Sequence, residues 1–235
     1  MVKLVKIAEQ CKRFDDMAKY MKQLIQVKKS TLTPEERNLF SVAYKNVVGA
    51  RLSAYRIISS MIAKQSTMGA NTTLAKAYRK EIVAEQKALC DEVVESGSGL
   101  SGRIVEDAGV EDKVFYRTME GDHYRYGVEV AEGEEQRNTW VLKANGAYQE
   151  GYDVARETLP GTHPIRLGLA LNYSVFDYEV MNDINMASKL AKDAFDHAIA
   201  GLNTLKGGSY KDSILIIMKQ LRDNLTLWTN NLNYM

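Results

Sequence analysis

The stretch RNLFSVAYKNVVGARLSAYR, from Arg37 to Arg56, decides the fold class. It follows a continuous helical pattern, and Gly49 is the only residue in it that disfavours a helix. Lys45, Leu52 and Arg56 follow one another at intervals of seven and four residues, so they share one helix face. The stretch therefore predicts a long helix with a cationic stripe that the apolar Leu52 interrupts.

The rest of the chain favours an all-α fold of about nine antiparallel helices. The 235 residues include three prolines, and none falls between Pro34 and Pro160 to break a long helix. Apolar residues recur at helical spacings, and the connections are short, which is typical of antiparallel neighbours. The expected helices are two short ones within residues 2–27, then 33–63, 73–95, 112–130, 135–158, 162–182, 183–205 and 209–230. We expect a single domain over residues 1–235, with a loop at about 96–110 and a short uncharged tail at 231–235.

Composition excludes several classes of partner. A formal net charge of +1 gives no bulk attraction to nucleic acid or to an anionic membrane surface. Cys11 and Cys90 lack the spacing of a metal site and indicate free thiols in a reducing compartment. No apolar run is long enough to span a bilayer, and the N-terminus has no signal-peptide core. We expect a soluble cytoplasmic protein without metal or cofactor, and without nucleic-acid or membrane partners.

Three further blocks resemble the same family as the opening stretch. They are VFYRTMEGDHYRYGVEVAEG (residues 114–133), THPIRLGLALNYSVFDYEV (residues 162–180) and SYKDS followed by LRDNLTLW (residues 209–228). Together the four blocks resemble the 14-3-3 proteins, which are phosphoserine- and phosphothreonine-binding adaptors. The resemblance implies a cup-shaped protomer whose concave groove holds an extended phosphopeptide of a client protein.

The resemblance assigns Lys45, Arg125 and Tyr126 to the phosphate. A phosphorylated side chain carries nearly two negative charges and three acceptor oxygens, and the arginine fork binds such a group in a bidentate manner. Asp122 lies three residues before Arg125 on one helix face and could orient the guanidinium. Without the family, the same two residues would be interpreted as an ordinary surface ion pair.

The resemblance also assigns peptide-binding residues. Asn172 and Asn224 match two clamps, because an asparagine amide can satisfy both backbone groups of an extended ligand. The alternative is an asparagine bonded to a neighbouring turn. Leu171, Val175, Leu227 and Trp228 match an apolar wall, although residues at such spacings are also typical of a core. Arg56 and Glu179 match charged residues at the rim, and Arg56 could meet acidic residues of a partner.

The chain departs from the family pattern at three places. Leu52 replaces a phosphate-binding arginine, and Thr118 stands where a lysine is usual. Arg51 and Arg117 are one residue out of phase with the missing cations, about 100° round the helix. The stretch 214–220 appears one residue longer than the pattern, which rotates the helix face unless a bulge absorbs it. We expect a weakened phosphate site and an altered groove wall.

The resemblance further implies a homodimer formed through the N-terminal helices. Arg13 and Glu85 match an ion pair across that interface, but Asp16 would face Glu81, and these like charges repel. Ala54 replaces a serine whose phosphorylation loosens some family dimers. The interface residues expected from the resemblance are Ile7, Cys11, Arg13, Ile58, Tyr78 and Glu85.

Two functions remain open, and an enzyme is excluded. The first is an adaptor that binds phosphorylated clients. The second is a helical scaffold that binds unphosphorylated acidic or amphipathic segments, and it predicts equal affinity for phosphorylated and unphosphorylated peptides. The three histidines are scattered, and no nucleophile motif or phosphate-cradling glycine loop occurs.

Overall fold

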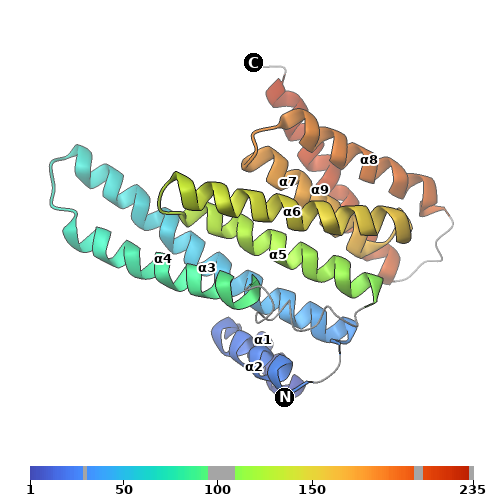
Figure 1. Ribbon diagram of the computed structural model, residues 1–235, viewed down its shortest axis with the longest axis horizontal. Coiled ribbons are helices and arrows are strands. Elements are labelled where there is room, and N and C mark those ends of the chain that lie inside the picture. The colour runs from blue at the N-terminus through green and yellow to red at the C-terminus, as the bar shows by residue number, and fades with distance from the viewer. Residues whose placement is uncertain (29–30, 95–108, 204–208, 233–235) are drawn as a thin grey trace. The chain divides into compact units, whose positions relative to one another are not determined.

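The computed structural model describes residues 1–28, 31–94, 109–203 and 209–232. Within those residues the chain forms nine helices and no strand, which confirms the all-α prediction (Figure 1). The helices are α1 (Val2–Gln10), α2 (Phe14–Val27), α3 (Pro34–Thr67), α4 (Thr73–Val94), α5 (Val110–Val130), α6 (Glu134–Thr158), α7 (Pro164–Glu179), α8 (Ile184–Leu202) and α9 (Ser209–Leu232).

The helices belong to two compact units. Unit 1 comprises Met1–Asp107 and Tyr126–Asn138, and unit 2 comprises Ala108–Arg125 and Thr139–Met235. Helices α5 and α6 contribute residues to both units. The single domain over residues 1–235 stays a prediction. Most of the expected loop at 96–110 and the end of the expected tail lie outside the described residues, while α9 continues to Leu232.

Helix α3 begins and ends at local sequence signals. The backbone N–H of Thr33 donates to the Glu36 carboxylate at 2.8 Å, and the N–H of Glu36 donates to the Thr33 hydroxyl at 3.3 Å. These two bonds form a capping box, and Pro34 occupies the first helical position. The helix runs one turn beyond the predicted end at Ala63, to Thr67, and Gly69 follows with a φ of +69°. Glycine adopts that left-handed conformation without steric cost.

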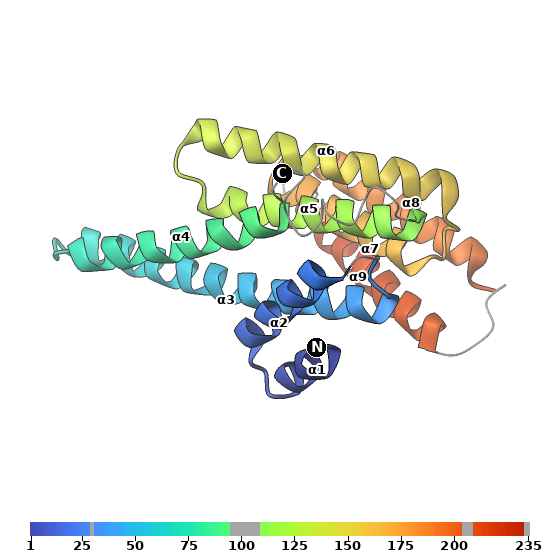
Figure 2. The same ribbon diagram turned by 60° about the horizontal axis from the view of Figure 1, so that its bottom comes forward.

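Unit 1 is built on the long pair of α3 and α4. The two helices lie side by side, and α1 and α2 pack on α3 (Figures 1 and 2). Ile58, Ile62 and Ile82 form a buried cluster between α3 and α4. Burying these branched side chains stabilises the pair by the hydrophobic effect.

Unit 2 centres on α7, α8 and α9, which contact one another pairwise. Helix α9 is α-helical across residues 214–220, without a bulge. Ile214, Met218, Leu221 and Trp228 all join the core from this helix at helical spacings. Gln220 is exposed. The additional residue inferred from the family pattern therefore leaves one continuous apolar face.

The turn between α7 and α8 ends the earlier helix sooner than predicted. Helix α7 stops at Glu179 rather than near Asn182, because Asn182 adopts a left-handed φ of +54°. Asparagine tolerates this conformation better than most residues. The Asp183 carboxylate accepts from the N–H of Met186 and caps the start of α8. Among the described residues, no helix is both long enough and apolar enough to cross a membrane.

Candidate functional site

The predicted clamp Asn172 is held by Asp122 inside unit 2. The side-chain amide of Asn172 donates to both carboxylate oxygens of Asp122, at 2.9 and 3.1 Å. The Tyr148 hydroxyl donates to the same carboxylate at 2.5 Å. Asp122 therefore joins α5, α6 and α7 through one partly buried polar cluster, and it fixes the orientation of the Asn172 amide.

A glycine allows this cluster to form. A Cβ at Gly121 would lie 2.6–2.8 Å from three ring atoms of Tyr148, which is closer than carbon atoms pack. Burial raises the pKa of the Tyr148 hydroxyl, and the charge of Asp122 adds to that rise, while the charge of Arg125 opposes it. The phenol consequently stays protonated and serves as a hydrogen-bond donor.

Arg125, the predicted phosphate ligand, lies at the edge of the same cluster. Its Nη1 is 3.4 Å from Oε2 of Glu179, and the Arg125 side chain is only 17% exposed. A hydrogen bond between charged groups is normally 2.7–2.9 Å long, so this ion pair is loose. The structure thus brings three predicted residues, Arg125, Asn172 and Glu179, into one region of unit 2.

The predicted apolar wall divides into core and surface positions. Trp228 is 2% exposed and stacks on Tyr178, with ring centroids 5.1 Å apart. Leu171 and Val175 are half-buried and pack against the same core cluster. Leu227 is 55% exposed, and Asn224 is half-buried. Trp228 is therefore a core residue beneath the predicted wall. Leu227, in contrast, is a surface residue.

In unit 1 the predicted cationic stripe is interrupted as expected. Lys45 is exposed, whereas the Leu52 side chain is buried, with 5% exposed. Arg56 is held by Glu129 through two bonds, Nε to Oε1 at 2.6 Å and Nη2 to Oε2 at 2.7 Å. Tyr126 is half-buried in this unit. The acidic residue that Arg56 meets belongs to the same chain.

The two arginines adjacent to the missing cations are engaged elsewhere. Arg51 binds Asp15 at 2.7 Å and Glu85 at 3.1 Å within unit 1. Arg117 binds Glu120 at 2.8 Å and Glu150 at 3.0 Å within unit 2. The Thr118 hydroxyl donates to the carbonyl of Val114, one turn earlier. Neither arginine therefore presents an uncompensated charge that could replace a phosphate ligand.

The residues expected at a dimer interface differ in exposure. Ile7 and Tyr78 are 55% and 58% exposed, Cys11 is also exposed, and Ile58 lies in the α3–α4 core. Arg13 pairs with Asp16 of its own chain, and Glu85 pairs with Arg51. The predicted interface role of these residues stays a prediction.

Sequence reasoning missed Tyr148, Glu129 and Tyr178. Gly121 directly precedes Asp122 in the sequence. Because glycine is disfavoured inside a helix, its presence there was a signal that another side chain packs closely against the backbone. Glu129 lies 73 residues from Arg56, and no local pattern joins them. The described residues contain no group of histidine, cysteine and acidic side chains able to hold a metal ion.

The fold and the site together define an all-helical protein whose candidate ligand-binding groups are arginine, lysine, asparagine and tyrosine. The family described as "14-3-3 protein" matches residues 4–229. The chain is 50% identical over 232 residues to "14-3-3-like protein 2" of Caenorhabditis elegans, covering 98% of this chain and 91% of that protein. It is 49% identical to "14-3-3 protein theta" of Mus musculus and of Homo sapiens, covering 98% of this chain and 92% of each.

The chain therefore belongs to the 14-3-3 family. Members of this family are non-enzymatic adaptors that typically bind phosphoserine and phosphothreonine, and they are generally cytoplasmic.

Proposed function

We propose that this protein is an adaptor that binds phosphoserine- or phosphothreonine-containing segments of client proteins, with Lys45, Arg125 and Tyr126 as the phosphate ligands. The observation that carries the proposal is the environment of Arg125. Its side chain is 17% exposed, and its ion pair with Glu179 is loose, at 3.4 Å. A phosphate can displace such a carboxylate, because it carries more charge and accepts in a bidentate manner.

Asn172 supports the same proposal from α7. Its amide nitrogen faces the Asp122 carboxylate, so its oxygen is left to accept from a ligand. Asn224, Val175, Leu171 and Leu227 supply the remaining clamp and wall, with Trp228 behind them. These residues bind the backbone and apolar side chains of an extended segment and require no particular sequence. Like the family in general, the protein acts in the cytoplasm.

The experiment is a titration of matched phosphorylated and unphosphorylated peptides, measured by fluorescence anisotropy at fixed ionic strength. We expect the phosphopeptide to bind at least about tenfold more tightly, since a hydrogen bond to a charged group contributes about 1.5–3 kcal/mol. Arg125→Gln should abolish that difference. The matched control is Arg156→Gln, which removes an exposed arginine from α6 of the same unit.

A phosphate-independent scaffold is the second candidate function. Two observations favour it: Leu52 is buried where the family places an arginine, and Glu129 neutralises Arg56. The scaffold predicts equal affinity for the two peptides and no effect of Arg125→Gln. The same titration therefore decides between the two functions.

The proposed adaptor is also a homodimer that associates through unit 1. Large apolar side chains are exposed on α1, α3 and α4, among them Leu4, Ile7, Ile57, Met61, Leu74 and Tyr78. Pairing with Arg13 balances the charge of Asp16, so repulsion between Asp16 and Glu81 is weaker than the sequence suggests. Native mass spectrometry at low micromolar concentration should detect a dimer, and a monomer alone would contradict this proposal. Tyr78→Asp should favour the monomer, while Leu142→Asp, at an exposed position of unit 2, should not.

A further inference from the structure

We propose that Gln220 on α9 is a further backbone clamp that works together with Asn224, so that the two side-chain amides bind backbone groups two residues apart in an extended ligand segment. The inference rests on the proposed function, which assigns Asn224 to the backbone of the bound segment. It adds a residue that determines specificity, because this clamp needs a backbone N–H at one defined position of the ligand.

Gln220 and Asn224 belong to one ridge of helix α9, in which the members are four residues apart. The ridge comprises Ile216, Gln220, Asn224 and Trp228, each rotated about 40° from the one before. Exposure falls along it: Ile216 is 61% exposed, Gln220 is exposed, Asn224 is half-buried and Trp228 is 2% exposed. The ridge therefore runs from solvent into the core of unit 2.

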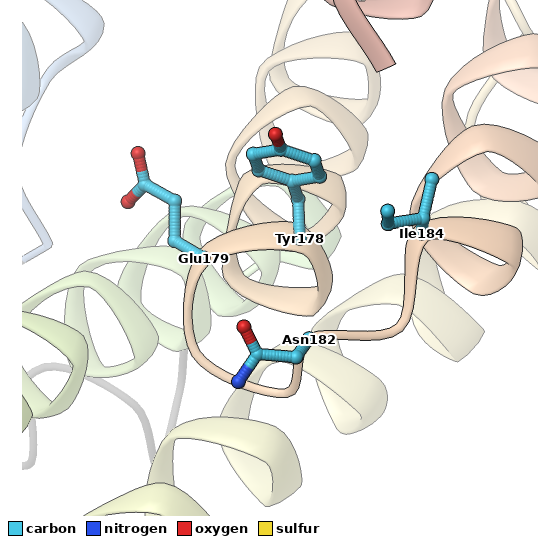
Figure 3. A pocket seen from close by; sticks show the side chains of 4 residues that line it. All are labelled: Tyr178, Glu179, Asn182 and Ile184. Atoms are coloured by element: carbon cyan, nitrogen blue, oxygen red, sulfur yellow. The ribbon is translucent and has the colours of Figure 1, made fainter. Parts of the chain in front are cut away.

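The buried end of this ridge is fixed by helix α7. Trp228 stacks on Tyr178 with ring centroids 5.1 Å apart and an interplanar angle of 20°. Figure 3 shows the Tyr178 ring on the last turn of α7, and α7 and α9 contact each other directly. Asn224 and Gln220 therefore lie one and two turns along α9 from a rigid contact with the helix that carries Asn172.

Both amides are available to a ligand. Among the hydrogen bonds of the described residues, none involves the side chain of Gln220 or of Asn224. By contrast, the exposed amide of Gln149 donates to the Asp153 carboxylate at 3.0 Å. Each of the two amides on α9 thus keeps its donors and its acceptor for a bound segment.

Exposed apolar side chains flank the two amides. Ile216 lies one turn before Gln220, and Leu227, which is 55% exposed, lies one turn after Asn224. Gln220 and Leu227 are seven residues apart and share a helix face. A segment whose side chains cover Ile216 and Leu227 excludes water from the amides between them, and this strengthens the hydrogen bonds that the amides make.

The spacing of the two amides matches an extended backbone. Residues four apart in an α-helix are separated by about 6 Å along the axis. In an extended segment the N–H and C=O of one residue point to the same side, and the next residue with that orientation is about 6.4–6.8 Å away. Gln220 and Asn224 can each bond both backbone groups of such a residue. The additional methylene of glutamine offsets the rotation of Gln220 away from α7.

A clamp at Gln220 recognises the backbone of the ligand and not its side chains. The residue that faces Gln220 can therefore carry almost any side chain. Proline is the exception, because it has no backbone N–H and would leave the amide oxygen of Gln220 without a donor.

The test is an ester scan of one phosphoserine peptide, measured by fluorescence anisotropy. Each backbone amide within five residues of the phosphoserine is replaced in turn by an ester, which removes the N–H and keeps the side chain. In the wild type we expect esters at clamped residues to weaken binding about two- to tenfold each. Gln220→Leu should abolish the effect of one such ester, and Asn224→Leu the effect of an ester two residues away.

Two further measurements isolate Gln220. Proline at the residue that the scan assigns to Gln220 should weaken binding to the wild type more than binding to Gln220→Leu. Thr226→Leu makes an exposed position of α9 apolar about 120° round the helix from Gln220, and it should keep the ester profile of the wild type. Thermal unfolding of Gln220→Leu should match the wild type, since Gln220 is exposed.

The outcomes separate the inference from the proposed function. An ester profile of Gln220→Leu that equals that of the wild type overturns the clamp while phosphate binding stands. The same holds if the esters affected by Gln220→Leu and Asn224→Leu are not two residues apart. Equal affinity of the wild type for the phosphorylated and unphosphorylated forms of the parent peptide overturns the proposed function itself, and with it the inference.

Discussion

Asn172 donates its side-chain amide to both carboxylate oxygens of Asp122, across 50 residues of sequence, at 2.9 and 3.1 Å. Sequence reasoning paired Asp122 with Arg125 instead, because the two residues share a helix face. The described hydrogen bonds of the carboxylate run to Asn172 and Tyr148. Asp122 therefore orients the side-chain amide of Asn172, the proposed peptide clamp.

Asp122→Ala should weaken phosphopeptide binding about tenfold, because the Asn172 amide loses the partner that orients it and a buried donor is left unsatisfied. Asp122→Asn should be milder, since its amide keeps one acceptor oxygen for Tyr148 or Asn172. Fluorescence anisotropy with one phosphopeptide measures both effects. Asp196→Ala removes a carboxylate from the exposed Lys192–Asp196 pair and serves as the control. Unchanged affinity in Asp122→Ala would show that the clamp needs no orientation.

Leu52→Arg should strengthen phosphopeptide binding about tenfold and lower the melting temperature. Affinity for the phosphopeptide should rise because the variant restores a cation to the stripe of Lys45 and Arg56. The long arginine side chain can extend its charged end towards water. The melting temperature should fall because the variant removes an apolar side chain that is only 5% exposed. Peptide titration and thermal unfolding measure the two effects separately.

Leu52→Met is the matched control, because it keeps an apolar side chain of similar volume. We expect it to leave the affinity unchanged and to alter stability only slightly. If Leu52→Arg binds phosphopeptide no more tightly than Leu52→Met, the idea that Leu52 weakens the phosphate site is wrong.

Local signals predicted where helices begin better than where they end, and they predicted the partners of charged groups poorly. The Thr33–Glu36 box and the Asp183 cap depend on residues within three positions, so the sequence alone specifies them. The contact of Arg56 with Glu129 depends on how distant helices pack. Periodicity could not show that Trp228 lies in the core while the adjacent Leu227 is exposed, since both were apolar candidates on one helix. The family resemblance assigned roles to these residues without giving their burial.

Asp177 should make unit 2 less stable as pH rises through the weakly acidic range. Its carboxyl is buried with 7% exposed, and burial, together with the charge of Asp183, raises its pKa from 3.8 to about 6. Because the folded pKa is above the unfolded one, its contribution to stability is fully present below about pH 4. That contribution is lost between about pH 4 and pH 6, and it amounts to about 2–3 kcal/mol.

Asp177→Asn removes this titration. We expect the variant to unfold at a higher urea concentration than the wild type at about pH 8, and the difference to shrink towards about pH 4.5. Circular dichroism at a series of pH values measures it. Asp193→Asn, at an exposed position of α8, should follow the wild type at every pH. A difference between Asp177→Asn and the wild type that does not vary with pH would exclude ionisation of Asp177 as the cause.

Gly121→Ala should lower the free energy of unfolding by about 2 kcal/mol or more. The new methyl group would lie 2.6–2.8 Å from the ring of Tyr148, and that ring is fully buried and stacked on Tyr173 with centroids 5.4 Å apart. If Tyr148 moves, its bond to Asp122 breaks, and phosphopeptide affinity should fall as well. Gly146→Ala is the matched control, because nothing lies within 4 Å of its added Cβ and alanine favours the helix by about 0.5–1 kcal/mol. Urea unfolding of the two variants should therefore give changes of opposite sign, and a stabilised Gly121→Ala would show that α5 and α6 can separate without cost.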